Sequence, residues 1–265
     1  MAEAVSEISS DRQVGTATTI MPHLSVSQLK MYLRCPLQYF FRYVCGLKSP
    51  PTGDLTLGRT IHQTLNDNYK QKMKTGHDII IDHISELFSE YWDREARETE
   101  FAKGEKPGQF KDDGVGLLKA YFDQIAPGVQ PIEVEREFLI ETPGTRLPLK
   151  GYIDLIDDQA CIIDHKTTKR SFPENTAEKD VQLTAYSLAF RTLYGEEESG
   201  VRLDVMVRNK QPKIQQLYGT RTQADIDRFS RLAGQVENAI NSGVYYPNEG
   251  YMCGICGYQG MCEKW

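Results

Sequence analysis

The segment "LPLKGYIDLIDDQACIIDHKTT", residues 147–168, contains two apolar runs separated by a short polar turn. The runs at 147–157 and 160–167 predict two β-strands. The second run is almost continuously apolar, which is typical of a strand buried on both faces at the centre of a sheet. If the two strands pair as a hairpin, Asp154 on the first lies beside Asp164 on the second.

Helices and further strands are predicted on both sides of this segment, so the chain as a whole is expected to form a mixed α/β domain. Ser25 followed by Gln28 is a capping-box pattern that begins the first helix, and Pro36 is expected at the first position of a second helix. The other elements are expected as helices at 57–76 and twice within 82–125, a strand at 131–141, a helix at 175–195, strands at 201–209 and 213–220, and a helix at 222–243.

The helix expected at 57–76 has one buried stripe, because its apolar residues recur every four positions. These residues are Ile61, Leu65, Tyr69 and Met73. His62 lies at the edge of the stripe. A lone histidine beside an apolar stripe is more often a core residue than a ligand, so the residue pattern alone leaves its role open.

The composition is that of an ordinary soluble protein, with 40% hydrophobic and 26% charged residues among 265. No run of about eighteen apolar residues is present, so no transmembrane helix is predicted. Residues 1–22 lack the apolar region of a signal peptide and are expected to form a disordered tail. Six cysteines without a secretory signal indicate a reducing compartment, and we expect the protein in the cytoplasm.

The net charge of −6 does not indicate a basic nucleic-acid-binding face. This argument excludes little, because a metal-dependent site concentrates carboxylates that bound cations offset. Contacts with DNA are therefore expected from local basic residues, namely Arg34, Lys169 and Arg170.

Acidic and basic side chains converge at the end of the second predicted strand. Residues i and i+2 of a strand share a face, so Asp164 and Lys166 point together and His165 points away. Two adjacent carboxylates repel unless a cation lies between them, and carboxylate oxygens suit Mg²⁺ or Mn²⁺. One aspartate on a strand is usually a surface or turn residue, but Asp154 and Asp164 on paired strands favour a metal site.

Three motifs in this order, "GYIDLI", "CIIDHKTT" and "QLTAY", resemble the active-site core of the PD-(D/E)XK nuclease superfamily. "LGRTIHQTL" resembles the GxxxH helix motif of its RecB-like exonuclease branch, which includes the AddB nuclease domains and the CRISPR-associated adaptation exonucleases. "SQLKMYLRCPLQYFFRY" resembles the opening Cys-Pro helix of that branch. Each motif is weak alone, but their order over residues 24–265 makes the resemblance specific.

The resemblance implies a restriction-endonuclease-like fold, in which a central mixed sheet is flanked by helices. A nuclease domain is then expected over 23–265, with a helical insertion at 77–130 and a cysteine-rich, cluster-binding tail at 245–265. The sequence departs from the nominal superfamily pattern at Ile153, which replaces proline, and at Asp164, which replaces glutamate. Both variants are common in the RecB-like branch.

The resemblance also implies roles for individual residues. It makes His62 a metal ligand through its imidazole, Asp154 and Asp164 carboxylate ligands, and His165 a ligand through its backbone carbonyl. Lys166 is the implied catalytic lysine. The implied QxxxY pair, which would contact the DNA backbone or the lysine, is Gln182 and Tyr186. The side chain of His165 is expected behind the ligands or toward solvent. Glu135 is interpreted as one of three alternating glutamates on a solvated face of its strand, rather than as an acid behind the site.

The last thirteen residues contain three cysteines with metal-ligand spacing, one fewer than a tetrahedral site needs. In the RecB-like branch, one cysteine before the GxxxH helix completes a 4Fe-4S cluster, which implies Cys35 together with Cys253, Cys256 and Cys262. A Cys₄ zinc site has the same ligand count and stays open as an alternative. Cys45 is expected to be a small buried residue, and Cys161 a core residue.

The sequence therefore predicts a Mg²⁺- or Mn²⁺-dependent DNA nuclease, an exonuclease with a structural 4Fe-4S cluster. The resemblance implies work on single- or double-stranded DNA ends in recombination, repair or replication-linked processing, with a helicase or recombination protein as partner. Two alternatives stay open: a non-catalytic DNA-binding or scaffold protein on the same fold, and a zinc-stabilised metal-dependent hydrolase. Cleavage polarity, strand preference and oligomeric state are not predicted.

Overall fold

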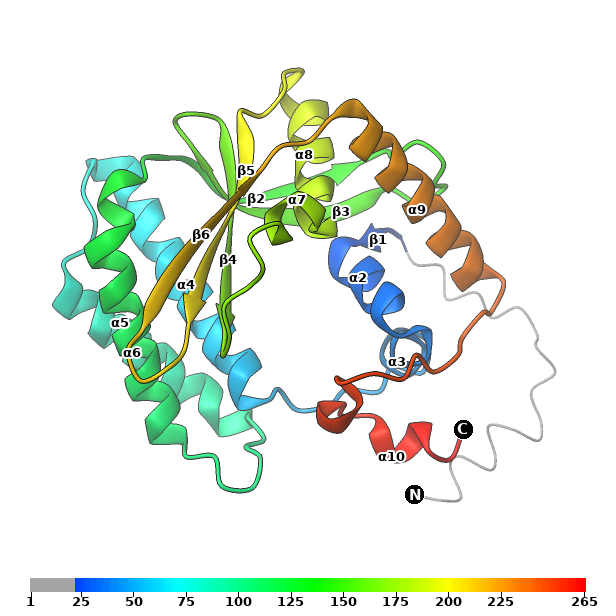
Figure 1. The fold of residues 1–265 in the computed structure, drawn as a ribbon, viewed down its shortest axis with the longest axis horizontal. Helices are drawn as coiled ribbons and strands as arrows, with labels where there is room; N and C mark the ends of the chain where they lie inside the picture. Colours follow the sequence, from blue (N-terminus) through cyan, green and yellow to red (C-terminus); the bar gives the residue numbers. More distant parts are fainter. Residues whose placement is uncertain (1–21) are drawn as a thin grey trace.

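A six-stranded mixed sheet lies at the centre of the computed structural model, which describes residues 22–265 (Figure 1). The expected disordered tail, residues 1–22, lies outside the described residues apart from Pro22. The strands follow the order β1–β3–β4–β5–β6, and β2 pairs with β3. Their bounds are β1 Leu24–Ser25, β2 Pro131–Ile140, β3 Leu149–Asp157, β4 Cys161–Thr168, β5 Gly200–Val207 and β6 Lys213–Gly219.

Helices cover both faces of this sheet, which confirms the predicted mixed α/β fold. The longer helices are α2 Val26–Arg34, α4 Gly53–Thr75, α5 Ile81–Glu95, α6 Pro107–Gln124, α8 Val181–Tyr194 and α9 Gln223–Asn241. Shorter segments are α3 Pro36–Tyr39, the π-helix Phe40–Val44, α7 Thr176–Lys179, α10 Gln259–Cys262 and three 3₁₀ turns at Ala96–Glu98, Ala126–Gly128 and Cys253–Ile255. None of the helices in the described chain is long and apolar enough to cross a membrane.

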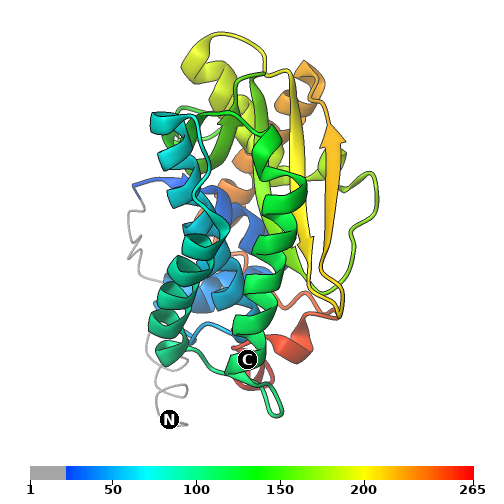
Figure 2. The same cartoon turned by 90° about the vertical axis from the view of Figure 1, so that its left-hand side faces the viewer.

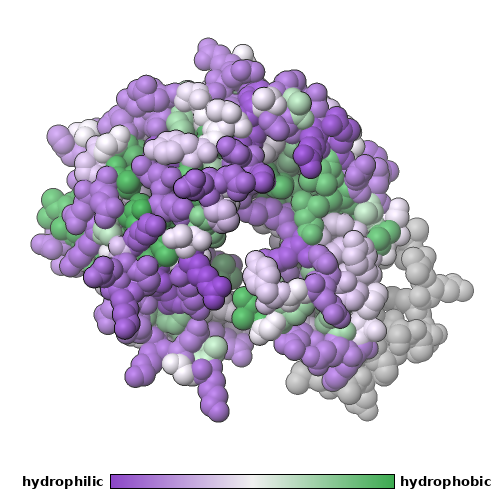
Figure 3. Space-filling model, in the orientation of Figure 1, coloured by the Kyte–Doolittle hydropathy of each residue, from purple (hydrophilic) through white to green (hydrophobic). Residues whose placement is uncertain are grey.

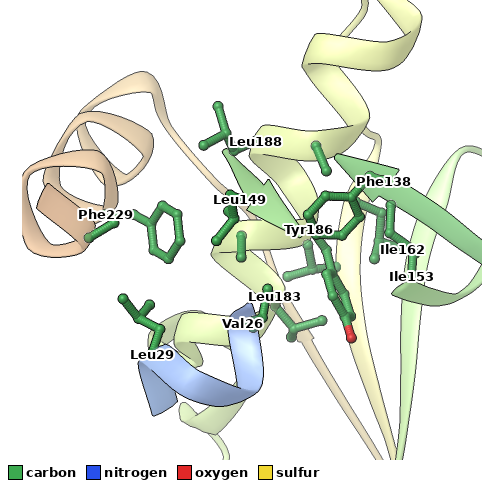
Figure 4. Packing of buried hydrophobic residues seen from close by; sticks show 14 of the residues in the cluster. Val26, Leu29, Phe138, Leu149, Ile153, Ile162, Leu183, Tyr186, Leu188 and Phe229 are labelled. Carbon is green, nitrogen blue, oxygen red and sulfur yellow. The ribbon is translucent and has the colours of Figure 1, made fainter. Parts of the chain in front are cut away.

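Two apolar cores lie on opposite faces of the sheet. On one face, α2, α8 and α9 pack against β2 and β3 through residues such as Leu29, Leu183 and Phe229 (Figure 4). On the other face α4, α5 and α6 form a helical layer, in which α5 and α6 lie side by side (Figure 2). In Figure 4 the ring of Tyr186 lies within the first core while its hydroxyl points out of it.

Local signals set most helix ends. The Ser25–Gln28 capping box and the helix start at Pro36 are both confirmed. The helix expected at 175–195 is interrupted at Asp180, whose carboxylate accepts the first backbone N–H groups of α8. Asp180 therefore ends α7 and caps α8, as expected for a residue that competes with helical hydrogen bonds.

The buried stripe of α4 was predicted correctly except at its end. Ile61, Leu65 and Tyr69 are buried, but Met73 is 43% exposed. A helix has 3.6 residues per turn, so a four-residue repeat drifts around its axis and the buried face moves to Lys72. The Lys72 ammonium is satisfied there by Asp78 and by the carbonyl of Ala126.

The strands β3 and β4 pair over a very short distance. Their antiparallel ladder contains only Leu155–Ile163 and Ile156–Ile162, so the predicted hairpin exists but opens immediately. At the start of β3, the same edge is occupied by β1, which runs parallel to β3 and pairs Leu24 with Leu149. Because α2 follows β1 directly, the short strand β1 anchors α2 beside the place where β3 and β4 separate.

Close packing of α9 on the β2–β3 loop provides a test of the fold. A Cβ on Gly234 would lie 2.3 Å from the backbone oxygen of Gly144, which cannot move as a side chain can. We expect Gly234→Ala to lower the free energy of unfolding by about 1–3 kcal/mol, measured by urea denaturation. Gly116→Ala in α6 is the control, because its Cβ would meet only Pro212 at 3.4 Å. It should stabilise the protein by up to about 1 kcal/mol through helix propensity. Equal urea midpoints for the two variants would show that the β2–β3 loop moves to make room for the added methyl group.

Candidate active site

The opening between β3 and β4 leaves the peptide of His165 without a strand partner on that side. Its N–H donates to Asp154 Oδ2 at 3.1 Å, and its carbonyl accepts from His62 Nε2 at 2.6 Å. These side chains replace the missing ladder hydrogen bonds, because a buried peptide group needs a partner. A carboxylate and an imidazole are thereby gathered around one peptide unit.

Three side chains in this opening offer ligand atoms at metal-binding spacing. Atoms of His62, Asp154 and His165 all lie within 4.8 Å of one another. His62 Nδ1 is 3.3 Å from Asp154 Oδ2, and His165 Nδ1 is 3.9 Å from the same oxygen. His62 comes from α4 and the other two from the sheet, so tertiary packing brings the GxxxH histidine to the carboxylate.

The imidazole of His165 lies inside the protein, with only 3% of the residue exposed. Of the two expected positions, this excludes the one toward solvent and leaves the one behind the ligands. Burial lowers the pKa of His165 to about 4, which keeps the ring neutral near pH 7. The ring shares a hydrogen bond of 3.1 Å with the Tyr121 hydroxyl, which also donates to Asp204. Asp204 in turn accepts two hydrogen bonds from Arg202. This buried network fixes the ring behind the opening.

The pair Asp164 and Lys166 lies on the opposite face of β4 from the His165 ring, as predicted. Asp164 Oδ2 is 2.5 Å from the Lys166 ammonium, and Oδ1 has no hydrogen-bond partner within residues 22–265. Burial raises the pKa of Asp164 to about 6 although Lys166 opposes the rise. A buried carboxylate oxygen without a partner is costly for the protein alone, and a cation at that oxygen would remove the cost.

The QxxxY residues lie next to the lysine. Gln182 Oε1 accepts from Lys166 Nζ at 3.1 Å, and the Gln182 amide donates to the Tyr186 hydroxyl. A helix places residues i and i+4 on one face, which brings both side chains toward β4. Burial, together with Asp154 and Asp164, raises the pKa of Tyr186 well above its usual value, so it is a neutral hydroxyl.

Glu135 faces the site and does not belong to a solvated face. The pairs Val134–Leu155 and Arg136–Ile153 flank it and place it opposite Asp154. Its backbone is in the left-handed region with φ 50°, which costs a non-glycine residue about 1–2 kcal/mol. Burial and the neighbouring Asp154 raise the pKa of the Glu135 carboxyl. Strand alternation could not reveal this, because the irregular backbone changes the direction of one side chain.

Lys30 is a second basic residue that the sequence reasoning missed. It lies on α2 and donates to Gln182 Oε1 at 2.7 Å, from a position 152 residues away in the sequence. The lysine stands in an amphipathic helix, and only the docking of α2 on α8 reveals its contact. Of the basic residues predicted to contact DNA, Lys169 is paired with Asp54 at 2.8 Å, and Arg34 donates to Gln38.

The cysteine-rich tail docks on the α2–α3 region. The backbone N–H of Leu37 donates to the carbonyl of Tyr246, and the Tyr258 hydroxyl donates to the carbonyl of Leu47. Tyr258 is buried in a third small core, against which the partly buried Cys35, Cys45, Cys256 and Cys262 pack. Cys45 is partly buried rather than fully buried. Cys161 is also partly buried, and it packs against the apolar core on the α4–α5–α6 face of the sheet, as expected for a core residue.

The four cysteines implied by the resemblance lie in one electrostatic neighbourhood. The pKa of the Cys262 thiol is raised by burial and then by Cys35, Cys256 and Cys253. Backbone N–H groups of Asn248 and Gly250 donate to the sulfurs of Cys35 and Cys253. Within the described chain, no three cysteine sulfurs lie within 4.8 Å of one another.

The acidic residues and the lysine lie where one strand of a mixed sheet separates from its neighbour, which is the arrangement of a restriction-endonuclease-like nuclease. The chain belongs to the PD-(D/E)XK nuclease superfamily, whose family model matches residues 23–263.

One solved structure supports this fold. A candidate exonuclease from Eubacterium rectale has a TM-score of 0.58 and 10% sequence identity, with 92% of both chains covered. The structure of SSO0001 is 17% identical in sequence, with 89% of this chain and 94% of that chain covered. Its TM-score of 0.38 is too low to indicate a shared fold. No curated protein sequence matches the chain.

Proposed function

We propose that this protein is a metal-dependent DNA exonuclease of the RecB-like branch. The observation that carries the proposal is the convergence of His62, Asp154 and the carbonyl of His165 beside the buried Asp164–Lys166 pair. A non-catalytic scaffold has no use for a buried carboxylate oxygen without a partner, and this favours an enzyme over that alternative.

His62, Asp154, Asp164 and the His165 carbonyl would hold the metal, and Glu135, which lies opposite Asp154 in the sheet, would assist. A divalent ion in this place supplies a Lewis acid for the phosphoryl oxygen and lowers the pKa of bound water. The donor set is mainly oxygen with one imidazole, which suits Mn²⁺ better than Mg²⁺. The unpartnered Oδ1 of Asp164 is the observation that fits such an ion.

The remaining site residues would act on the substrate. Burial disfavours the charged form of Lys166, but Asp164 and Asp154 outweigh burial and its pKa is raised, so it stays an ammonium. It would orient the attacking water and offset charge that grows on the phosphate oxygens. Gln182 accepts from Lys166 and so holds the ammonium in place, and Tyr186 orients Gln182 in turn.

We also propose a structural 4Fe-4S cluster on Cys35, Cys253, Cys256 and Cys262. Zinc would draw its four thiolates to about 3.8 Å from one another, given Zn–S bonds of about 2.3 Å. A 4Fe-4S cluster is larger than one ion and holds its thiolates farther apart, which is compatible with four neighbouring thiols of which no three sulfurs lie within 4.8 Å of one another. Hydrogen bonds from backbone N–H groups to sulfur, as at Cys35, are a usual feature around cluster thiolates.

A hole through the molecule, distinct from the separation of β3 and β4, supports the exonuclease mode. Figure 3 shows it in the orientation of Figure 1, between α2, α3 and α10 on one side and α4 and β4 on the other. Residues 45–52 join the π-helix to α4 and close the lower boundary, where Tyr258 binds Leu47. His62 from α4 and Lys30 from α2 both reach the site, so both sides of this ring contribute side chains to it.

A strand that must pass through a ring needs a free end. We expect the protein with Mn²⁺ to digest linear single-stranded DNA and to leave a circle of the same sequence intact over the same time. Gel analysis of end-labelled and circular substrates measures this, and the circle cut once with a restriction enzyme serves as the matched control. Equal digestion of circle and line would contradict threading and indicate an endonuclease.

The family relation extends the proposal to the cell. We propose a nuclease domain at 23–265, with the 77–130 insertion and the 245–265 tail, acting in the cytoplasm on DNA ends in recombination, repair or replication. A helicase or recombination protein is the proposed partner. The zinc-stabilised hydrolase remains the second candidate, and iron and zinc counts on protein purified without oxygen distinguish the two.

A further inference from the structure

Two ammonium groups share a single neutral acceptor beside the proposed metal site. Gln182 Oε1 accepts from Lys30 Nζ at 2.7 Å and from Lys166 Nζ at 3.1 Å. The amide oxygen orients both lysines but carries no charge to offset them. Lys30 comes from α2 and Lys166 from β4, so this meeting of cations depends on how α2 docks.

The charges around Lys30 leave it only weakly balanced. Its nearest carboxylate oxygen is Asp180 Oδ2, 4.0 Å away at the limit of an ion pair. The other oxygen of Asp180 already accepts the first N–H groups of α8. Burial lowers the pKa of Lys30 and the like charge of Lys166 lowers it further, and the carboxylates of Asp180, Asp164 and Asp154 only partly oppose this fall. An anion placed beside Lys30 would relieve both effects.

The two lysines differ in how open they are to a substrate. The Lys30 side chain is 38% exposed and that of Lys166 is 25% exposed, with the Lys166 ammonium bound to Asp164. Lys166 therefore faces the metal ligands. Lys30 belongs to α2, a helix that borders the hole seen in Figure 3. We expect a phosphate backbone bound along this border to bring the phosphate next to the cleaved one to the more exposed Lys30.

We propose that Lys30, oriented by Gln182, forms a second phosphate-binding subsite that holds a phosphate adjacent to the one cleaved. The proposal rests on the proposed nuclease function and extends it by a residue of the opening helix. An ammonium is a compact charge that suits a single phosphate oxygen. Because the contact is made before and during cleavage alike, it contributes uniform binding and should act on KM more than on kcat.

The test compares Lys30→Met, which keeps the length of the side chain but removes its charge, with Lys74→Met as control. Lys74 is an exposed lysine in the last turn of α4. Binding of a labelled single-stranded oligonucleotide is measured by anisotropy at several salt concentrations, with Ca²⁺ in place of Mn²⁺. We expect Lys30→Met to reduce the slope of log K against log salt by about 0.7, the value for one lost contact on a single strand. Lys74→Met should keep the parent slope.

Steady-state cleavage with Mn²⁺ completes the test. We expect Lys30→Met to raise KM with kcat near that of the parent, and Lys30→Arg to restore KM. The subsite would be overturned if Lys30→Met kept the parent slope of log K against log salt. A lower kcat and melting temperature with that unchanged slope would mean that Lys30 only holds α2 in place. The nuclease proposal would still stand in that case, provided that the parent protein cuts DNA. A parent protein that neither binds nor cuts DNA overturns both.

Discussion

Lys166→Ala is expected to abolish Mn²⁺-dependent DNA cleavage, with kcat lower by at least about 10³-fold, because the charge that balances the phosphate oxygens and orients water is lost. Asp164→Ala should lose activity to the same extent for a different reason, the loss of a metal ligand. Single-turnover digestion of an end-labelled oligonucleotide measures both.

The two variants should differ in metal binding. Mn²⁺ should stabilise the parent and Lys166→Ala against heat, because ligand binding to the native state raises the melting temperature. It should not stabilise Asp164→Ala. Breaking a buried ion pair costs about 3–5 kcal/mol, so circular dichroism must first show that each variant is folded. Lys166→Met, which fills the same space, replaces Lys166→Ala if the latter unfolds.

Lys213→Ala is the matched control, since Lys213 is an exposed lysine at the start of β6. It should cut DNA as the parent does. Parental cleavage by Asp164→Ala would show that the metal site has been assigned to the wrong residues. Cleavage by Lys166→Ala with normal metal binding would remove the lysine from the mechanism and leave the metal site in place.

If the proposed cluster is present, Cys35→Ala is expected to lose its iron and its visible absorbance together with several kcal/mol of stability. A metal centre that joins residue 35 to residues 253–262 restricts almost the whole unfolded chain, and its binding free energy becomes folding free energy. For a chain of this size, a loss of about 4 kcal/mol corresponds to a fall of roughly 10 °C in melting temperature. Iron analysis, absorbance spectra and thermal melts of protein prepared without oxygen measure the change.

Cys45→Ala provides a close control for this experiment, because Cys45 packs against the same small core but is absent from the thiols that raise the pKa of Cys262. It should keep both iron and colour. Loss of iron in Cys45→Ala with retention in Cys35→Ala would exchange the two residues in the ligand set. Zinc in place of iron in the parent would identify the tail as a zinc site.

The elements of this fold could be predicted from the sequence where the signal is local. The capping box at Ser25, the start at Pro36 and the apolar runs around Asp154 and Asp164 each depend on residues within a few positions. The two-residue strand β1 could not be predicted, because its only signature is the pairing of Leu24 with Leu149. Met73 was misplaced because a four-residue repeat does not match the period of a helix.

The candidate site divides in the same way. The sequence by itself determined the class of chemistry: Asp164 and Lys166 share a strand face because strands alternate, and Gln182 and Tyr186 share a helix face because they are one turn apart. The resemblance implied His62 as a further ligand, but Lys30 and Glu135 were revealed only by the tertiary structure. Lys30 and His62 reach the site through the docking of whole helices, and Glu135 through an irregular strand. Periodicity specifies the face on which a side chain lies, but the contacts between elements depend on packing that no local pattern encodes.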